Sequence, residues 1–333
     1  NVGTGKTVTV DSISLADGNN GGLASNYSIT PGQTTTANIT AKSLTISGII
    51  ASSKTYNGST SATLDTSAIL YSGLIPGDTF DGSYTGVFSN TNVGTAKTVT
   101  ITSSYTGADV SNYSITNQSS TTADISAKAL TATASASNKT YDATNSASIT
   151  LTLSGLIGSE TLGSTSTSTF NNNNAGTGKT VTVNSITLAD GTNGGLAANY
   201  SISTGQTTTA NVTAKALTVS GITASNKVYD STTNATTVLS FSGLIGSETI
   251  NNTNSSTFDN KNIGTGKTVT VNSLTLVDGS NGGLASNYSI SSGQTTTANV
   301  SARPLTVSNI SASNKSYDGT TTVTLDTSNV SYN

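Results

Sequence analysis

The sequence predicts an all-β protein, built from tandem β-sandwich domains that follow one another as an elongated rod. Two observations lead to this class. Valine alternates with threonine at Val181 and Val183, at Val269 and Val271, and at Val8 and Val10. A period of two residues is typical of a strand with one buried face. The same short motifs also return about every 87 residues, which is the size of a small sandwich domain.

The repeat is visible in four motifs that keep one order along the chain. Asn-Tyr-Ser-Ile begins at residues 26, 112, 199 and 287, in steps of 86, 87 and 88 residues. Lys-x-Tyr-Asp/Asn begins at residues 54, 139, 227 and 315. Gly-Thr-Gly/Ala-Lys begins at residues 3, 94, 176 and 264, and Ser-Gly-Leu-Ile at residues 72, 154 and 242. Solenoid coils repeat within about 20 to 47 residues, so we reject a β-helix.

Short polar joints such as Ala127-Lys128 and Ala214-Lys215 mark the predicted domain boundaries. We expect three complete domains between two partial ones, and because the chain starts and stops inside a repeat, we expect the natural array to continue on both sides. The predicted domains are residues 1–40 (the C-terminal part of a repeat), 41–126, 127–213, 214–301 and 302–333 (the N-terminal part of a repeat).

The alternation of apolar residues places the strands inside one repeat. It shifts by one residue between Val271 and Leu274, and again between Val183 and Ile186, which predicts a bulge or a sharp crossing at each place. The Gly- and Asn-rich stretch at residues 278–283 predicts a loop with positive φ angles. In the repeat 214–301 we expect strands at residues 217–223, 237–244, 248–258, 267–276, 288–291 and 295–301.

Composition excludes several classes of function. The 333 residues carry a net charge of −3 and contain no His, Cys, Met or Trp. Disulfides, thiolate chemistry and imidazole ligands are therefore absent, and no cationic face is available to bind nucleic acid. No apolar run is long enough to cross a membrane, and any export signal would lie outside this piece. We predict no enzyme activity, no catalytic residue, no cofactor, no metal and no membrane insertion in this piece.

The motifs resemble the YDG repeat. The resemblance is carried by residues 227–230, 242–245, 262–269 and 287–290, although Tyr-Asp-Gly itself is intact only at residues 317–319. Its third position varies in the other repeats, which argues against a ligand role there. YDG repeats occur in large haemagglutinin-like bacterial adhesins, including two-partner-secreted adhesins of biofilm matrices. The resemblance therefore implies an extracellular or cell-surface chain with immunoglobulin-like sandwiches in an adhesin stalk.

Three candidate sites have simpler explanations. Gly264-Thr265-Gly266-Lys267-Thr268 mimics a phosphate-binding loop, but the first glycine of that motif is missing and a strand follows, so a turn entering a strand is the better interpretation. A spontaneous isopeptide bond would need a regular acidic helper, and this position holds Glu160, Glu248 and Asp78. Calcium could use repeated aspartates, but hydrogen bonds within turns explain each of them. These aspartates are Asp142, Asp230 and Asp318, with Asp190 and Asp278.

The leading hypothesis for function is a structural stalk that gives reach for adhesion, aggregation or biofilm formation. The alternative is a subunit of a self-assembling matrix or sheath filament, which exposed strand edges would favour. A glycan-binding module and a hydrolase rank below both. The expected partners are neighbouring repeats of the same chain, with other copies of the fibre and extracellular polysaccharide as further candidates.

A tyrosine corner is the last expectation. In immunoglobulin-like sandwiches a tyrosine near the start of a late strand bonds its hydroxyl to a backbone group a few residues upstream. Tyr113, Tyr200 and Tyr288 are the candidates, and Ile115, Ile202 and Ile290 fill the core position two residues later. We expect Tyr200→Phe to cost about 0.5–1.5 kcal/mol if the hydroxyl is buried and bonded.

Overall fold

The computed structural model describes all 333 residues as β-strands joined by turns and single turns of 3-10 helix, which confirms the all-β prediction. None of these helical turns exceeds three residues, and none could span a membrane. Each turn ends at the Asn of an Asn-Tyr motif, just before the tyrosine. The four turns are η1 (Ala24–Asn26), η2 (Val110–Asn112), η3 (Ala197–Asn199) and η4 (Ala285–Asn287).

Residues 1–126 contain twelve strands. In the partial repeat they are β1 (Gly3–Thr9) and β2 (Thr34–Ile39). In the first complete repeat they are β3 (Lys42–Ser47), β4 (Ile50–Ala51), β5 (Lys54–Thr55), β6 (Ser61–Ala62), β7 (Leu64–Asp65), β8 (Leu70–Ser72), β9 (Asp81–Phe88), β10 (Gly94–Thr106), β11 (Tyr113–Thr116) and β12 (Ser120–Ser126).

The same order of strands returns in the rest of the chain. Residues 127–213 form β13 (Lys128–Ala136), β14 (Lys139–Thr140), β15 (Ile149–Ser154), β16 (Leu162–Phe170), β17 (Gly176–Asp190), β18 (Tyr200–Ile202) and β19 (Thr207–Thr213). Residues 214–301 form β20 (Lys215–Ala216), β21 (Thr218–Ala224), β22 (Lys227–Val228), β23 (Asn234–Ala235), β24 (Thr237–Ser242), β25 (Ile250–Phe258), β26 (Gly264–Asp278), β27 (Tyr288–Ser289) and β28 (Thr295–Ser301). The last partial repeat holds β29 (Val307–Ser308), β30 (Ser311–Ala312), β31 (Leu325–Asp326) and β32 (Ser331–Tyr332).

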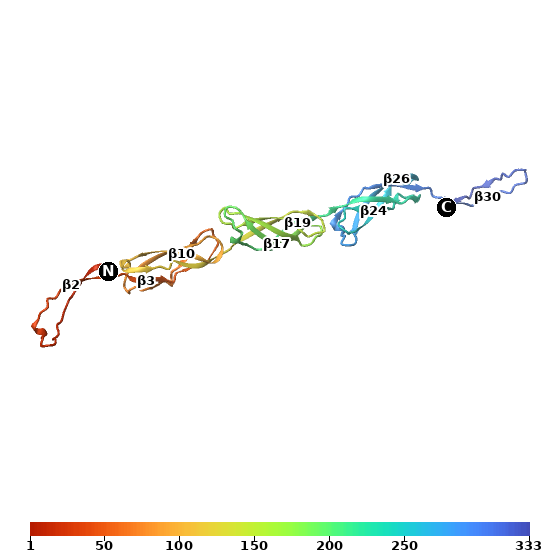
Figure 1. Cartoon of the computed structure of the whole chain (residues 1–333). Helices are drawn as coiled ribbons and strands as arrows, with labels where there is room; N and C mark the ends of the chain where they lie inside the picture. Colours follow the sequence, from red (N-terminus) through yellow and green to blue (C-terminus); the bar gives the residue numbers. More distant parts are fainter. The chain divides into compact units, whose positions relative to one another are not determined.

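Each complete repeat contains a curled, half-barrel sheet, and the first four strands follow one order in all three sheets, with a fifth strand in the first and the third. The orders are β5-β12-β10-β9-β6, β14-β19-β17-β16 and β22-β28-β26-β25-β23. Figure 1 shows β10, β17 and β26, the longest strand of each sheet. The sheets are mixed, because the short strand of the Lys-x-Tyr motif pairs in parallel at one edge, as β22 does with β28.

The expected bulge is present in β26, where the register against β25 shifts between Ser255 and Ser256. Asn272 is the extra residue, so Val271 and Leu274 reach the same side of the sheet despite their odd spacing. The loop at residues 278–283 also has the expected backbone, with Asn281 at φ 55° and Gly282 at φ 88°. The bulge predicted between Val183 and Ile186 stays a prediction.

The expected strands were found with shifted ends, and three short ones were not anticipated. The strand expected at residues 267–276 extends from Gly264 to Asp278, and the one expected at 288–291 ends at Ser289. The short strands β20, β22 and β23 have too few residues to show any alternation, so periodicity could not reveal them.

The alternating valines form the predicted buried face in the complete repeats but not in the first partial one. Val181, Val183, Val269 and Val271 are fully buried. Val8 belongs to the same motif and is 44% exposed, which corrects our expectation for that segment. The reason is that β1 pairs only with β2.

The chain forms two compact units, and the border between them runs inside residues 127–213. One unit consists of Asn1–Thr133, Thr152–Thr165 and Ile186–Ser203. The other consists of Ala134–Leu151, Ser166–Ser185 and Thr204–Asn333. Each unit therefore contains residues from two consecutive complete repeats, and the contacts between those repeats can be described within it.

Candidate functional site: the junction between consecutive repeats

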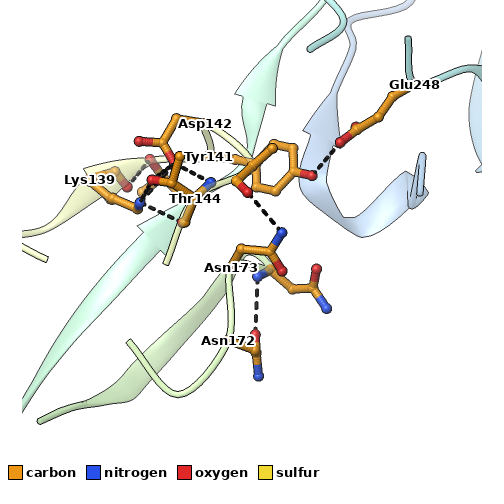
Figure 2. A network of polar contacts seen from close by, with 10 residues as sticks. Lys139, Tyr141, Asp142, Thr144, Asn172, Asn173 and Glu248 are labelled. Atoms are coloured by element: carbon orange, nitrogen blue, oxygen red, sulfur yellow. Dashed lines mark hydrogen bonds and ion pairs between the residues drawn. The ribbon is translucent and has the colours of Figure 1, made fainter. Parts of the chain in front are cut away.

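The Lys-x-Tyr-Asp motif folds into a tight clip. Lys139 donates to the Asp142 carboxylate over 2.7 Å and to the carbonyl of Thr144 over 2.7 Å, and its ammonium lies 5.6 Å from the Phe170 ring centroid. The Asp142 carboxylate also accepts the backbone N–H of Thr144 (Figure 2). The clip closes the turn that follows Tyr141, so the tyrosine ring is held in one position.

The residue that follows the Asp or Asn of this motif, which is the third residue of Tyr-Asp-Gly, has a left-handed backbone in every repeat. The φ angles are 74° at Gly58, 62° at Ala143, 64° at Ser231 and 71° at Gly319. Glycine adopts such angles freely, whereas a residue with a Cβ is strained there by about 1–2 kcal/mol. A glycine at this position therefore serves the backbone.

The tyrosine of this clip is bonded to the following repeat. The Tyr141 hydroxyl donates to Oε1 of Glu248 over 2.7 Å (Figure 2). Tyr288 donates to Oε2 of the same carboxylate over 2.6 Å. The two rings meet edge to face, with centroids 5.5 Å apart. One carboxylate thus joins a tyrosine from each of two consecutive repeats.

The same arrangement occurs one repeat earlier. Tyr56 donates to Oε1 of Glu160 and Tyr200 donates to Oε2, each over 2.6 Å. Their rings also meet edge to face, with centroids 5.4 Å apart. Aromatic pairs of this geometry and hydrogen bonds to a carboxylate are each favourable beyond the area that they bury.

An asparagine closes the junction beside each tyrosine pair. Asn287 is completely buried, and its Oδ1 accepts the backbone N–H of Ala175 over 2.8 Å. Asn199 is 1% exposed and accepts the N–H of Val93 over 2.9 Å. A buried amide needs such partners, and here they belong to the preceding repeat. Asn112 makes the equivalent bond with the N–H of Val2.

Apolar side chains extend the contact on both sides of the boundary. Tyr141, Phe170 and Val212 of one repeat belong to the same buried cluster as Leu217 and Tyr288 of the next. A second cluster combines Tyr56, Phe88 and Ile125 with Leu130 and Tyr200. Consecutive repeats therefore share one continuous core across each boundary. We call these two groups of contacts the 141–288 junction and the 56–200 junction.

Burial changes the acidity of the junction tyrosines. It raises the pKa of Tyr141 to about 12, and the hydrogen bond to Glu248 acts in the same direction. Burial likewise raises the pKa of Tyr56 to about 12, with the bond to Glu160 adding to it. Both hydroxyls are therefore protonated donors over the whole neutral range, as a structural bond to a carboxylate requires.

The aspartates weighed as calcium ligands are engaged in turns. Asp230 pairs with Lys227 over 2.9 Å and accepts the N–H of Thr232, and these bonds lower its pKa to about 2. Asp278 accepts the N–H of Ala285 over 2.7 Å. No group of three or more acidic side chains is placed to hold a metal ion. The prediction that these carboxylates serve turns is confirmed, because each has its own local partner.

The segment that mimics a phosphate-binding loop is part of a strand. Gly264 begins β26, and the register against β28 shifts between Gly264 and Lys267. Gly266 has φ 60°, and its N–H donates to Oδ1 of Asn299. We expected a turn entering a strand, whereas the residues form a bulge inside the strand. The strand begins earlier because Gly264 already pairs with Val300.

The acidic residues considered as helpers for an isopeptide bond form hydrogen bonds with tyrosine hydroxyls. Glu160, Glu248 and Asp78 each accept the hydroxyl of an Asn-Tyr-Ser-Ile tyrosine. They come from the loop that follows Ser-Gly-Leu-Ile, so this loop and the Asn-Tyr motif meet at one end of the repeat. The irregular choice between Glu and Asp fits this role, since either carboxylate can accept the bond.

The expected tyrosine corner has a different partner from the one predicted. The Tyr200 hydroxyl is buried and bonded, but it accepts the N–H of Ile157, which lies 43 residues upstream and not a few. The cause is that β18 pairs in parallel with β13, which places Tyr200 beside the Ser-Gly-Leu-Ile loop. Tyr113 and Tyr288 accept the N–H of Ile75 and Ile245 in the same way. Ile115, Ile202 and Ile290 pack against the buried clusters as expected.

Comparison with known proteins agrees with this repeated geometry. Residues 40–123, 126–210 and 213–298 each match the YDG domain. The chain belongs to the YDG domain family. No curated protein matches it. The three YDG domains occur in tandem, and the two junctions connect the first to the second and the second to the third.

Sequence reasoning missed the junction itself. It did not connect Glu160 or Glu248 with the tyrosines of either motif. One signal was available. The Asn-Tyr motif, the acidic residue and the Lys-x-Tyr motif each return in every complete repeat.

Proposed function

We propose that this chain is a structural stalk segment of a secreted bacterial adhesin or a similar extracellular fibre, which gives reach for adhesion, aggregation or biofilm formation. The observation that carries the proposal is the repeated junction. A stalk must transmit force from one domain to the next, and a shared apolar core with a doubly bonded carboxylate resists separation of the domains better than a free linker would.

The proposal includes a finer description of the fold. Each YDG domain would be an immunoglobulin-like sandwich, in which the curled sheet packs against the smaller sheet that contains the Leu-Thr strand, such as β3 with β11 and β8. Arranged in series, three such domains would form a rod. Strands of about eight residues rise about 26 Å, so each domain with its loops would add about 30–40 Å.

We further propose an extracellular or cell-surface location and no catalytic activity. The junction supports a structural role because its titratable side chains are hydrogen-bonded to one another. The proposed partners are the neighbouring repeats, and other copies of the fibre and extracellular polysaccharide are the candidates to test.

Small-angle X-ray scattering of the whole chain tests the serial arrangement. We expect a maximum dimension above about 100 Å. A compact globule would refute the stalk. Electron microscopy at rising protein concentration adds a second criterion, since isolated rods are expected of a stalk and regular lateral bundles of a matrix subunit.

A further inference from the structure

The lysine clip of the first complete repeat differs from the next two in one functional group. Lys139 and Lys227 each pair with the carboxylate of an aspartate three residues later, over 2.7 Å and 2.9 Å. Lys54 instead donates to the neutral amide oxygen of Asn57 over 3.2 Å. Burial lowers the pKa of Lys54, and the amide supplies no negative charge to oppose this. The same set of donors therefore holds an uncharged group in this repeat.

Glycine follows Asn57, and this neighbour makes the amide reactive. The backbone nitrogen of the next residue can attack the side-chain carbonyl carbon of an asparagine and close a succinimide ring, and glycine has no side chain to hinder the attack. Asn57 and Gly58 are both exposed, so water reaches them. The Asn57 oxygen accepts the N–H of Ser59 over 3.0 Å, which folds the side chain back toward the Gly58 nitrogen.

Two donors converge on the oxygen that becomes negative during this attack. They are the Lys54 ammonium, 3.2 Å from Oδ1 of Asn57, and the N–H of Ser59, 3.0 Å from it. In the second repeat the equivalent donors, Lys139 and the N–H of Thr144, hold a full carboxylate charge (Figure 2). Donors already placed around a developing oxyanion lower the barrier to its formation. The clip is therefore built to stabilise negative charge at this atom.

We propose that the first clip promotes its own conversion, the deamidation of Asn57 to aspartate. The Gly58 N–H gives its proton to hydroxide, and the nitrogen bonds to Cγ of Asn57 while Lys54 and the Ser59 N–H stabilise the oxyanion. The Cγ–Nδ2 bond then breaks and ammonia leaves. Water adds to Cγ of the succinimide, and the bond from Cγ to the Gly58 nitrogen breaks and restores the N–H. The overall reaction consumes one water and releases one ammonia.

The product gives the first clip the same charge pair as the next two. An aspartate at position 57 pairs with Lys54, and the turn that follows Tyr56 is closed by an ion pair. Tyr56 donates to Glu160 in the 56–200 junction, so the reaction stabilises the turn that holds a junction residue. Water attack on the main-chain carbonyl of the succinimide would give isoaspartate instead. The two donors favour attack at Cγ, so we expect aspartate to predominate. This inference does not depend on the stalk function.

Peptide mapping by mass spectrometry measures the reaction in the whole chain during incubation in mildly alkaline buffer. The converted peptide gains about 1 Da, because OH replaces NH2. Asn193 and Asn281 are internal references, since glycine follows each of them and neither lies in a lysine clip. Their amide nitrogens donate to backbone carbonyls, each over 3.0 Å. We expect Asn57 to convert about tenfold faster than either reference in the folded chain, and at a similar rate in urea.

Variants of Lys54 test the oxyanion donor. Lys54→Met should lower the rate at Asn57 by about tenfold, and Lys54→Arg should retain part of it, because the guanidinium also donates with a positive charge. Unchanged rates at Asn193 and Asn281 show that the rest of the chain stays folded. The share of aspartate over isoaspartate should fall in Lys54→Met, which a purely structural role of Lys54 does not predict.

The reactive group can also be moved to the second repeat. Asp142→Asn combined with Ala143→Gly leaves Lys139 and the N–H of Thr144 in place, so the new amide should convert about as fast as that of Asn57. This variant decides the question even where Lys54→Met disturbs the fold of the first clip. The proposal is overturned if Asn57 reacts no faster than the references, if Lys54→Met leaves its rate unchanged, or if the transferred amide stays intact.

Discussion

Replacing Tyr141 by phenylalanine removes one oxygen atom from the 141–288 junction and changes little else. Tyr141 is 3% exposed, and its hydroxyl donates over 2.7 Å to a carboxylate oxygen of Glu248. The ring stays in contact with Tyr288, because phenylalanine has the same shape. The substitution therefore isolates the hydrogen bond between the two repeats.

The expected cost follows from the partners on the two sides of that bond. A hydrogen bond to a charged group contributes about 1.5–3 kcal/mol. Glu248 keeps its second bond, from Tyr288, so its carboxylate is not left without a donor. We therefore expect the lower end of the range, about 1.5 kcal/mol, which corresponds to about a tenfold change in the local opening equilibrium.

Amide hydrogen exchange measures this opening at a single site. The N–H of Ala175 donates to Oδ1 of Asn287 across the 141–288 junction, so its exchange rate reports separation of the two repeats there. Tyr141→Phe should increase that rate about tenfold. Tyr229→Phe is the matched control, because Tyr229 holds the same place in its motif and its hydroxyl makes no hydrogen bond. It should leave the rate unchanged.

Two results would refute this reasoning. If Tyr141→Phe left the exchange of Ala175 unchanged, the bond to Glu248 would not stabilise the junction. If Tyr229→Phe accelerated exchange as much as Tyr141→Phe, the effect would come from the loss of any tyrosine hydroxyl and not from the contact between repeats.

Three further predictions concern metals, pH and backbone strain. A chelator should not change the melting temperature, because the aspartates bond within turns, and a drop restored by calcium would contradict this. The pKa values of Tyr56 and Tyr141 rise from the ordinary 10.0 to about 12 on folding, so their contribution to stability is complete below pH 10 and is lost as the pH rises through 12. Urea midpoints that stay constant over that interval would contradict it. Ala143→Gly should raise stability by about 1 kcal/mol, since Ala143 has φ 62°, and Gly58→Ala should lower it. Melting curves in which Ala143→Gly is no more stable than the wild type would show that this backbone is not strained.

The sequence by itself determined the strands and the repeat. Alternating valines, as at Val269 and Val271, indicated a buried face because side chains along a strand point alternately to its two sides. The odd spacing from Val271 to Leu274 indicated a bulge or a sharp crossing between them, and the structure shows a bulge with Asn272 as the extra residue. These features depend on neighbours along the chain, so local patterns are enough to predict them.

Only the tertiary structure decided the junction. Tyr56 and Glu160 lie 104 residues apart in the sequence, and Tyr141 and Glu248 lie 107 residues apart. No local pattern connects residues at such distances, because their meeting depends on how one repeat begins where the previous one ends. A half-buried tyrosine and a tyrosine that bridges two repeats look the same in sequence. Tyr141 bridges two repeats because, in the folded chain, the Glu248 carboxylate of the next repeat lies within hydrogen-bonding distance of its hydroxyl.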